Sequence, residues 1–208
     1  TVGDWVAVRL VGDQAVIQAV LPRRSRFVRH MAGPITDIQV VAANIDTALL
    51  VTGLDDDYNP RRLERYLVQV RDSGAQAVIV LTKADLCADA AAHRAETADL
   101  LQVPVVAVSS LTGDGIDDLS PSLRPGHTLA LLGSSGAGKS TLLNVLMGRE
   151  VQRTHGVRAT DSHGRHTTTA RQLFRLPCGA LIIDTPGMRE LQLWADTGSL
   201  DGAFGDID

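Results

Sequence analysis

The sequence predicts an α/β fold, a mostly parallel sheet with helices on both faces, preceded by part of a small all-β domain. Short apolar runs rich in β-branched residues alternate with longer amphipathic stretches, which is the pattern of such a sheet. The segment 133–140, GSSGAGKS, fits the phosphate-loop pattern G-x-x-x-x-G-K-S/T and lies between an expected strand and an expected helix. We therefore expect a P-loop domain in residues 37–208 and a partial β domain in residues 1–36.

The N-terminal segment is expected to begin with a β-hairpin. Residues 5–10 and 15–21 are rich in strand-forming residues, and Gly12 and Asp13 between them signal a turn. Basic residues gather at the end of this segment and again at 149–175: Arg23, Arg24, Arg26, Arg29 and His30, then Arg149, Arg153, Arg158, Arg165, Arg171 and Arg175. Such clusters can neutralise RNA phosphates, although an ordinary solvated face gives the same pattern.

The second domain is expected to open with a strand at 47–51 and a helix after it. Asn59 is placed to cap that helix, Pro60 to occupy its first position and Gly74 to end it. Its apolar stripe is formed by Leu63, Tyr66, Leu67 and Val70. Further strands are expected at 77–81, 103–108, 129–132 and 180–183, with helices at 89–101 and 141–146.

The phosphate loop indicates a nucleoside triphosphate site. Its glycines let successive main-chain N–H groups turn toward an anionic phosphate, and the N-terminus of the next helix adds a favourable dipole. Lys139 would reach the terminal phosphates, and the Ser140 hydroxyl would ligate Mg²⁺. The phosphate-binding residues predicted here are Gly133, Ser134, Ser135, Gly136, Ala137, Gly138, Lys139, Ser140 and Thr141.

Two polar segments after expected strands indicate which base is bound. Segment 82–85, Thr-Lys-Ala-Asp, resembles the guanine-recognition motif N/T-K-x-D of GTPases. A carboxylate at Asp85 can accept hydrogen bonds from the guanine N1–H and amino groups, a pair of donors that adenine lacks, and the stem of Lys83 can cover the base. Segment 109–115 resembles the GTPase loop whose main-chain N–H contacts the guanine oxygen. The base-binding residues predicted here are Thr82, Lys83, Ala84, Asp85, Ser109 and Ser110.

A third motif lies downstream of the phosphate loop. Asp184-Thr185-Pro186-Gly187 has the D-x-x-G arrangement, in which the aspartate holds Mg²⁺ through water and the N–H of Gly187 would sense the γ-phosphate. Ordinary small GTPases run from the phosphate loop to the base motif, whereas here the base motif comes first. The order of the motifs therefore predicts a circularly permuted GTPase.

The permuted order, the segment GRHTTT at 164–169, and the segments VGDWV at 2–6 and LPRRS at 21–25 together resemble the RsgA (YjeQ) family. This resemblance implies a GTP hydrolase that is stimulated by the small ribosomal subunit, acts in its late assembly and contacts its rRNA. It also implies that residues 1–36 are the end of an OB-fold barrel. The family's C-terminal domain binds zinc through Cys and His ligands that this sequence does not contain, so Mg²⁺ is the metal expected here.

The GRHTTT segment would supply the remaining catalytic groups. Its likeness to other permuted GTPases assigns a Mg²⁺ ligand to Thr168, with Thr167 open as the alternative. Met188 occupies the position where many GTPases carry a water-orienting glutamine. The family's histidine is thought to orient that water, which assigns the role to His166, with a structural role as the alternative. The predicted catalytic residues are His166, Lys139 and Thr168, and the predicted Mg²⁺ ligands are Ser140, Thr168 and, through water, Asp184.

Length and composition bear on the number of domains, on membrane spans and on the state of the cysteines. With 208 residues, 44 % of them hydrophobic, the chain can form one full domain and a fragment of another. No apolar run approaches the about 18 residues of a membrane span. Two isolated cysteines, Cys87 and Cys178, favour a reduced cytoplasmic protein, which we expect to be monomeric. Two alternatives stay open: a GTP-dependent RNA- or ribosome-binding module with incidental hydrolysis, and an ATP-using P-loop enzyme such as a kinase, which segment 82–85 argues against.

Overall fold

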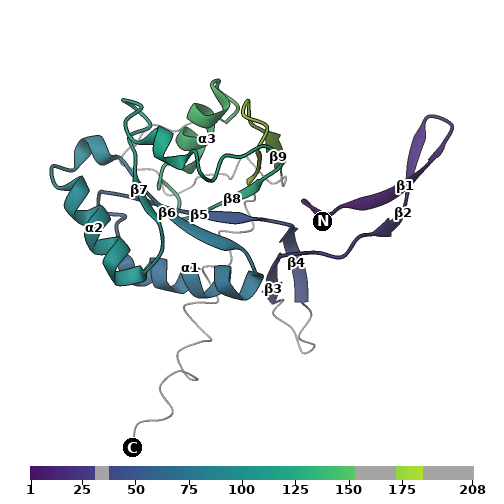
Figure 1. Ribbon diagram of the computed structural model, residues 1–208, viewed down its shortest axis with the longest axis horizontal. Coiled ribbons are helices and arrows are strands. Elements are labelled where there is room, and N and C mark those ends of the chain that lie inside the picture. Colours follow the sequence, from purple (N-terminus) through teal and green to yellow (C-terminus); the bar gives the residue numbers. More distant parts are fainter. Residues whose placement is uncertain (31–37, 153–171, 185–208) are drawn as a thin grey trace, which may run out of the picture.

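The computed structural model describes residues 1–30, 38–152 and 172–184, and its main body is a six-stranded sheet with helices on both faces (Figure 1). The strand order is β7-β6-β5-β8-β10-β9, and every neighbouring pair is parallel except β10 and β9. The strands are β5 (Thr47–Gly53), β6 (Gln76–Thr82), β7 (Val105–Ala107), β8 (Thr128–Leu132), β9 (Gln172–Arg175) and β10 (Leu181–Asp184). The predicted mostly parallel α/β domain is confirmed.

Both faces of the sheet bury apolar side chains, because successive strand residues point to opposite faces. Leu50 of β5 packs with Leu63 on one face, whereas Leu49 packs with Leu142 on the other. In Figure 1 helices α1 and α2 lie on one side of the sheet and α3 on the other. The helices are α1 (Pro60–Ser73), α2 (Ala90–Leu101) and α3 (Lys139–Met147), with short 3₁₀ turns at Ala84–Leu86 and Ile116–Leu119.

Helix α1 begins and ends where the sequence predicts. The Asn59 side chain accepts a hydrogen bond from the Arg62 N–H at 3.1 Å, and Pro60 is the first helical residue. Gly74 ends the helix with a φ of 84°, and its N–H donates to Arg71 O. The predicted stripe Leu63, Tyr66, Leu67 and Val70 is buried. The cap signals therefore set both boundaries of this helix.

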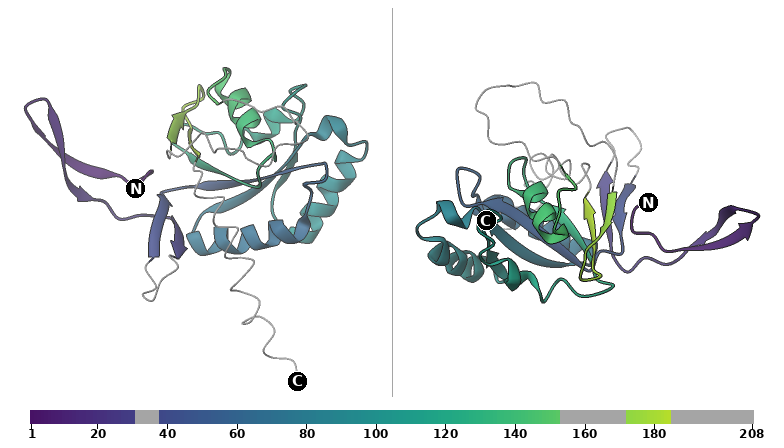
Figure 2. Two further views of the ribbon diagram at one scale, coloured as in Figure 1. Left: turned by 180° about the vertical axis from the view of Figure 1, so that it is seen from behind. Right: turned by 90° about the horizontal axis from the view of Figure 1, so that it is seen from above.

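The N-terminal strands form two antiparallel pairs. The predicted hairpin is present as β1 (Val6–Val11) and β2 (Gln14–Val20), and it extends away from the sheet with every residue exposed (Figure 2). The second pair, β3 (Arg26–His30) and β4 (Ile38–Ala43), was not predicted from the sequence. Phe27 of β3 is buried with side chains of α1, so this pair joins the core of the larger domain.

Two further details differ from the sequence-based expectation. The strand expected at 103–108 is confined to Val105–Ala107, although the Val108 N–H still donates to Leu81 O at 2.8 Å. Strand β9 was not predicted, because its four residues are mostly exposed and gain their order by pairing with β10. Within residues 1–30, 38–152 and 172–184, no helix combines the length and apolar character that crossing a membrane needs.

Candidate nucleotide-binding site

The predicted base motif and the phosphate loop meet at the carboxyl edge of the sheet. Strand β6 ends at Thr82 and β8 runs into Gly133, with β5 between them. The Thr82 hydroxyl donates a hydrogen bond to Ala137 O at 2.7 Å and lies 3.2 Å from Thr52 O. Segments that are far apart in the sequence are thus in direct contact. This edge is where open α/β sheets bind their ligands.

The phosphate loop, residues 133–140, is packed against the neighbouring strand and around its own lysine. Gly133 has a φ of 149°, and a Cβ there would lie 2.1 Å from Val51 O, so a larger residue does not fit. Lys139 is 7 % exposed, and its Nζ donates to Gly133 O at 2.8 Å and to Ser134 O. The loop ends at the N-terminus of α3, where main-chain N–H groups and the helix dipole favour an anion.

The other predicted loop residues surround this centre. Ala137 is buried. Gly138 has a φ of 90°, and a Cβ at this position would lie 3.2 Å from Thr82 Oγ1. Ser140 lies in the first turn of α3. The exposed members of the set are Ser135, Gly136 and Thr141.

The predicted base-binding residues occupy the ends of β6 and β7. Asp85 is exposed, and its side chain makes no hydrogen bond with any of the described residues. The Ala84 N–H donates to Val108 O at 3.1 Å, which brings the ends of the two strands together. Ser109 is buried, and its Oγ accepts hydrogen bonds from the N–H groups of residues 111 and 112. The Ser110 Oγ is buried without a hydrogen-bond partner in the described part of the chain. The carboxylate of Asp85 is therefore available to a ligand.

Two carboxylates that the sequence analysis did not single out contact the site. Asp57 contacts the phosphate loop, and Asp55 contacts the base motif. The Ser134 Oγ lies 2.6 and 2.7 Å from the two carboxylate oxygens of Asp57 and donates to that group. Lys83 Nζ forms an ion pair with Asp55 Oδ2 at 2.5 Å. Burial would raise the pKa of Asp55, but hydrogen bonds from Lys83 and from the Asp57 N–H leave that pKa below its ordinary value. The sequence feature that could have indicated these residues is the run of three aspartates shortly after a buried strand.

Two of the three predicted Mg²⁺ ligands lie in the described residues. Ser140 is in the first turn of α3, and Asp184 ends β10, the strand beside β8 from which the phosphate loop emerges. A hydroxyl and a carboxylate are hard oxygen ligands, so this pair fits Mg²⁺. Asp184 accepts a hydrogen bond from Gln152 Nε2. Within the three described ranges, no group of three or more His, Cys, Asp or Glu side chains could hold a metal.

Several predicted site residues lie outside the described residues. They are His166, Thr168 with its alternative Thr167, and Gly187. The structure thus brings together the base motif, the phosphate loop and the first residue of D-x-x-G. The roles assigned to the GRHTTT segment stay predictions.

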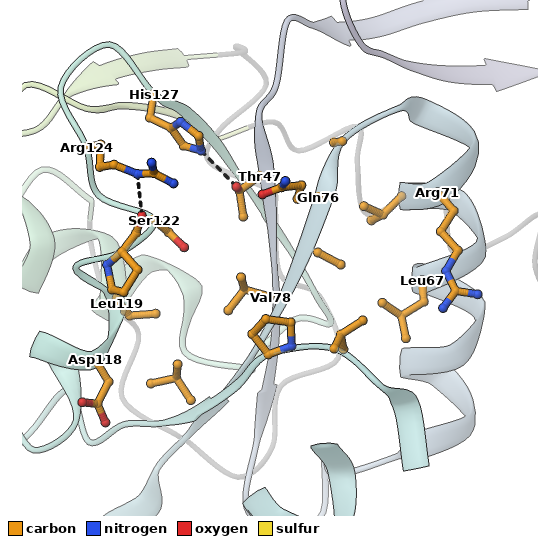
Figure 3. Close-up of a pocket in the computed structure, with 17 residues that line it drawn as sticks. Thr47, Leu67, Arg71, Gln76, Val78, Asp118, Leu119, Ser122, Arg124 and His127 are labelled. Carbon is orange, nitrogen blue, oxygen red and sulfur yellow. Dashed lines mark hydrogen bonds between the residues drawn. The ribbon is translucent and has the colours of Figure 1, made fainter. Parts of the chain in front are cut away.

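A separate cavity of about 560 Å³ lies at the opposite edge of the sheet (Figure 3). Thr47 and Gln76, the first residues of β5 and β6, line it together with His127, which precedes β8. Thr47 Oγ1 and His127 Nε2 share a hydrogen bond of 3.1 Å, drawn in Figure 3. The cavity lies at the amino ends of these parallel strands, whereas the phosphate loop follows the carboxyl end of β8. The cavity is therefore not part of the candidate nucleotide site.

Comparison with known proteins agrees with this geometry. The RsgA GTPase family model matches residues 20–194. A "Small ribosomal subunit biogenesis GTPase RsgA" of Opitutus terrae is 54 % identical over 207 residues, covering 93 % of this chain and 56 % of that protein. The "Small ribosomal subunit biogenesis GTPase RsgA 2" of Lactiplantibacillus plantarum is 50 % identical over 208 residues, covering 99 % of this chain and 58 % of that protein. The chain thus spans little more than half the length of these relatives.

Solved structures show the same fold. The crystal structure of YjeQ from Thermotoga maritima superposes with a TM-score of 0.63 and 27 % identity, covering 91 % of this chain and 61 % of that one. YloQ, described as a circularly permuted GTPase, superposes with a TM-score of 0.55 and 24 % identity, covering 91 % of this chain and 57 % of that one. The permuted order predicted from the motifs matches the fold of these structures.

Proposed function

The chain belongs to the RsgA GTPase family, and we propose that it binds GTP and hydrolyses it to GDP and phosphate at the carboxyl edge of its sheet. The observation that carries the proposal is the hydrogen bond from Thr82 Oγ1 to Ala137 O. This contact joins a guanine-type motif to a phosphate loop, so one ligand could meet both. Adenine does not offer Asp85 the two donors that guanine does, which argues against an ATP-using enzyme.

The described residues suggest how the nucleotide would be held. Asp85 would accept hydrogen bonds from the guanine N1–H and amino groups, with the stem of Lys83 across the base. Lys139 Nζ would exchange its two carbonyl contacts for phosphate oxygens. Ser140 and, through water, Asp184 would hold Mg²⁺, which neutralises charge on the phosphates when bound. Phosphoryl transfer to water needs this positioning and charge neutralisation more than covalent chemistry.

The catalytic step itself is assigned to residues of the GRHTTT segment. His166 would orient the attacking water as a hydrogen-bond acceptor, and Thr168 would complete the Mg²⁺ shell, with Thr167 as the alternative ligand. Since Met188 stands where many GTPases carry a water-orienting glutamine, we expect slow intrinsic turnover, on the order of 10⁻⁴ to 10⁻² s⁻¹, that rises when a partner orders the GRHTTT segment.

The partner proposed for the full protein is the small ribosomal subunit and its rRNA, during maturation of that subunit in the cytoplasm. The names of the relatives support this partner. A basic cluster at the end of the β1–β2 hairpin supports contact with RNA phosphates, although part of it is engaged within the protein. Arg23 pairs with Asp4, and Arg24, whose side chain is 70 % exposed, lies 3.3 Å from Asp46. We propose that the protein acts as a monomer.

The test is GTP hydrolysis by the full-length protein and by this chain, each alone and with purified small ribosomal subunits. Lys139→Ala serves as the inactive reference, because it removes the charge that faces the terminal phosphates. Stimulation by the subunits at least about tenfold over the isolated rate would support the proposal. An isolated rate already at the stimulated level, or GTP binding without any stimulation of the full-length protein, would contradict it and favour a binding module with incidental hydrolysis.

A further inference from the structure

The loop after β5, residues 54–58, lies between the two halves of the candidate site. β5 is the central neighbour of β6, which ends in the base motif, and of β8, which runs into the phosphate loop. Because the three strands are parallel, this β5 loop emerges at the same edge as both motifs. It carries three consecutive carboxylates, Asp55, Asp56 and Asp57. Two of them contact the site, and each contacts a different half.

Asp57 ties the phosphate loop to strand β5 and helix α1. Its carboxylate accepts the Ser134 hydroxyl at 2.6 Å and pairs with an Arg62 guanidinium nitrogen at 2.7 Å. The hydroxyl of Thr52 and the N–H of Gly53 lie 3.3 Å from its second oxygen. Arg62 belongs to the first turn of α1 and Thr52 to β5, so the carboxylate is anchored by regular elements. The hydrogen bond from Ser134 therefore holds the phosphate loop at a fixed position relative to β5 and α1.

Asp55 holds the base motif in an equivalent way. Its carboxylate lies 2.5 Å from Lys83 Nζ and accepts a hydrogen bond from the Asp57 N–H at 3.1 Å. A Cβ at Gly53 would lie 2.4 Å from Asp55 Oδ1 and 3.3 Å from Lys83 Cδ. The ion pair is thus packed over a glycine, and the lysine stem is held beside the strand end. That stem is the part of the site expected to cover the base.

The charges of these two carboxylates are balanced locally. Asp57 faces the guanidinium of Arg62, and Asp55 faces the ammonium of Lys83, so neither adds an uncompensated negative charge beside a phosphate. Asp56 differs from both, because it makes no hydrogen bond or ion pair with the residues that the structure describes. Asp56 can therefore serve as a matched control for substitutions of Asp55 and Asp57.

We propose that the β5 loop positions both halves of the nucleotide site, with Asp57 fixing the phosphate loop through Ser134 and Asp55 fixing the base motif through Lys83. This inference rests on the proposed binding of guanine nucleotides. Both aspartates are positioning residues, since each acts through another side chain. The proposal separates their effects: Asp57 governs the contribution of the phosphates to affinity, and Asp55 governs the contribution of the base.

The experiment measures the dissociation constants of GDP and of guanosine, which lacks phosphates, for the wild-type chain and three variants. Asp57→Ala should weaken GDP binding about tenfold and change guanosine binding less than about twofold. Asp55→Ala should weaken both ligands by a similar factor, about fivefold, because both carry the base. Asp56→Ala, which removes the same charge from the same loop, should leave both constants within about twofold of the wild type.

A double-mutant cycle tests whether Asp57 acts through Ser134. In a Ser134→Ala background, Asp57→Ala should cost far less GDP affinity than it costs alone, because the shared hydrogen bond is already gone. If Asp57→Ala does not fold, judged by its melting curve, Ser134→Ala alone should reproduce the selective loss of GDP binding. Equal losses of GDP and guanosine with Asp57→Ala, or additive effects in the cycle, would overturn the inference. A wild-type chain that binds no GDP would overturn the proposed function and this inference with it.

Discussion

The hydroxyl of Thr82 lies 2.7 Å from the carbonyl oxygen of Ala137, and this hydrogen bond links the end of β6 to the middle of the phosphate loop. Many GTPases place an asparagine where this chain has Thr82. A threonine has one hydroxyl, and here the hydroxyl serves the phosphate loop. Gly138 packs against the same side chain, since a Cβ at that glycine would lie 3.2 Å from Thr82 Oγ1. The two motifs therefore form one packed unit.

Removing this hydrogen bond without changing the side-chain shape should weaken nucleotide binding. We expect Thr82→Val to lower GDP affinity about fivefold and the free energy of unfolding by about 1 kcal/mol, because Ala137 O would be left buried without its partner. Thr82→Ser, which keeps the hydroxyl, is the control and should retain most of both. Calorimetric titration and urea unfolding measure the two effects. Equal affinities for the valine and serine variants would refute the coupling.

The close packing of Gly133 leads to a second prediction. A Cβ at Gly133, whose φ is 149°, would lie 2.1 Å from Val51 O, whereas a Cβ at Gly136, whose φ is 82°, meets no atom within 4 Å. Gly133→Ala should therefore lower the free energy of unfolding by more than about 3 kcal/mol or prevent folding, and Gly136→Ala should lower it by about 1 kcal/mol. Thermal melts of the two variants test this difference, and similar melting temperatures would contradict it.

The pair formed by Asp4 and Arg23 predicts a dependence of stability on pH. Arg23 donates from Nε and from one terminal nitrogen to the two Asp4 oxygens, at 2.7 and 3.0 Å. This guanidinium, together with the ammonium group of Thr1, lowers the pKa of Asp4 to about 2, below its value of about 3.9 in an unfolded chain. Because the folded pKa is the lower one, the pair stabilises the fold above about pH 4, and that contribution is lost as the pH falls toward about 2.

The measurement is urea unfolding of Arg23→Ala at about pH 6 and at about pH 2.5. We expect a loss of no more than about 1 kcal/mol at the higher pH, because the pair is partly exposed, and a smaller difference from the wild type at the lower pH. Arg26→Ala is the control, since Arg26 is exposed and has no partner among the described residues. A difference that grows on acidification would contradict the assignment.

The parts of the fold that were predictable from the sequence are those whose signals are local. Asn59, Pro60 and Gly74 mark the ends of α1 by chemistry within one helical turn of each boundary. The central strands were predictable because they are short, apolar and buried on both faces. Strand β9 has no such signal, since it is ordered by pairing with β10, as in the register of Phe174 with Ile182.

The same distinction applies to the candidate site. The phosphate loop and the base motif were found because each is a contiguous pattern with its own chemistry. Asp57 was missed because its partner, Ser134, lies 77 positions further along the chain, and three adjacent aspartates after a strand resemble an ordinary polar turn. Only the order of strands in the sheet brings these residues together, and no local pattern in the sequence encodes that order.

The choice of base is the last prediction, and it depends on Asp85. This carboxylate is exposed at the end of β6 and free of partners among the described residues, so its two oxygens can accept both guanine donors. Asp85→Asn should lower GDP affinity by at least about tenfold and raise affinity for xanthosine diphosphate, because the amide can donate to the oxygen that replaces the guanine amino group. Competition against a fluorescent nucleotide gives both constants. Asp89→Asn, a nearby exposed aspartate at the start of α2, should leave both unchanged. If Asp85→Asn keeps the wild-type preference for GDP, the base is recognised elsewhere.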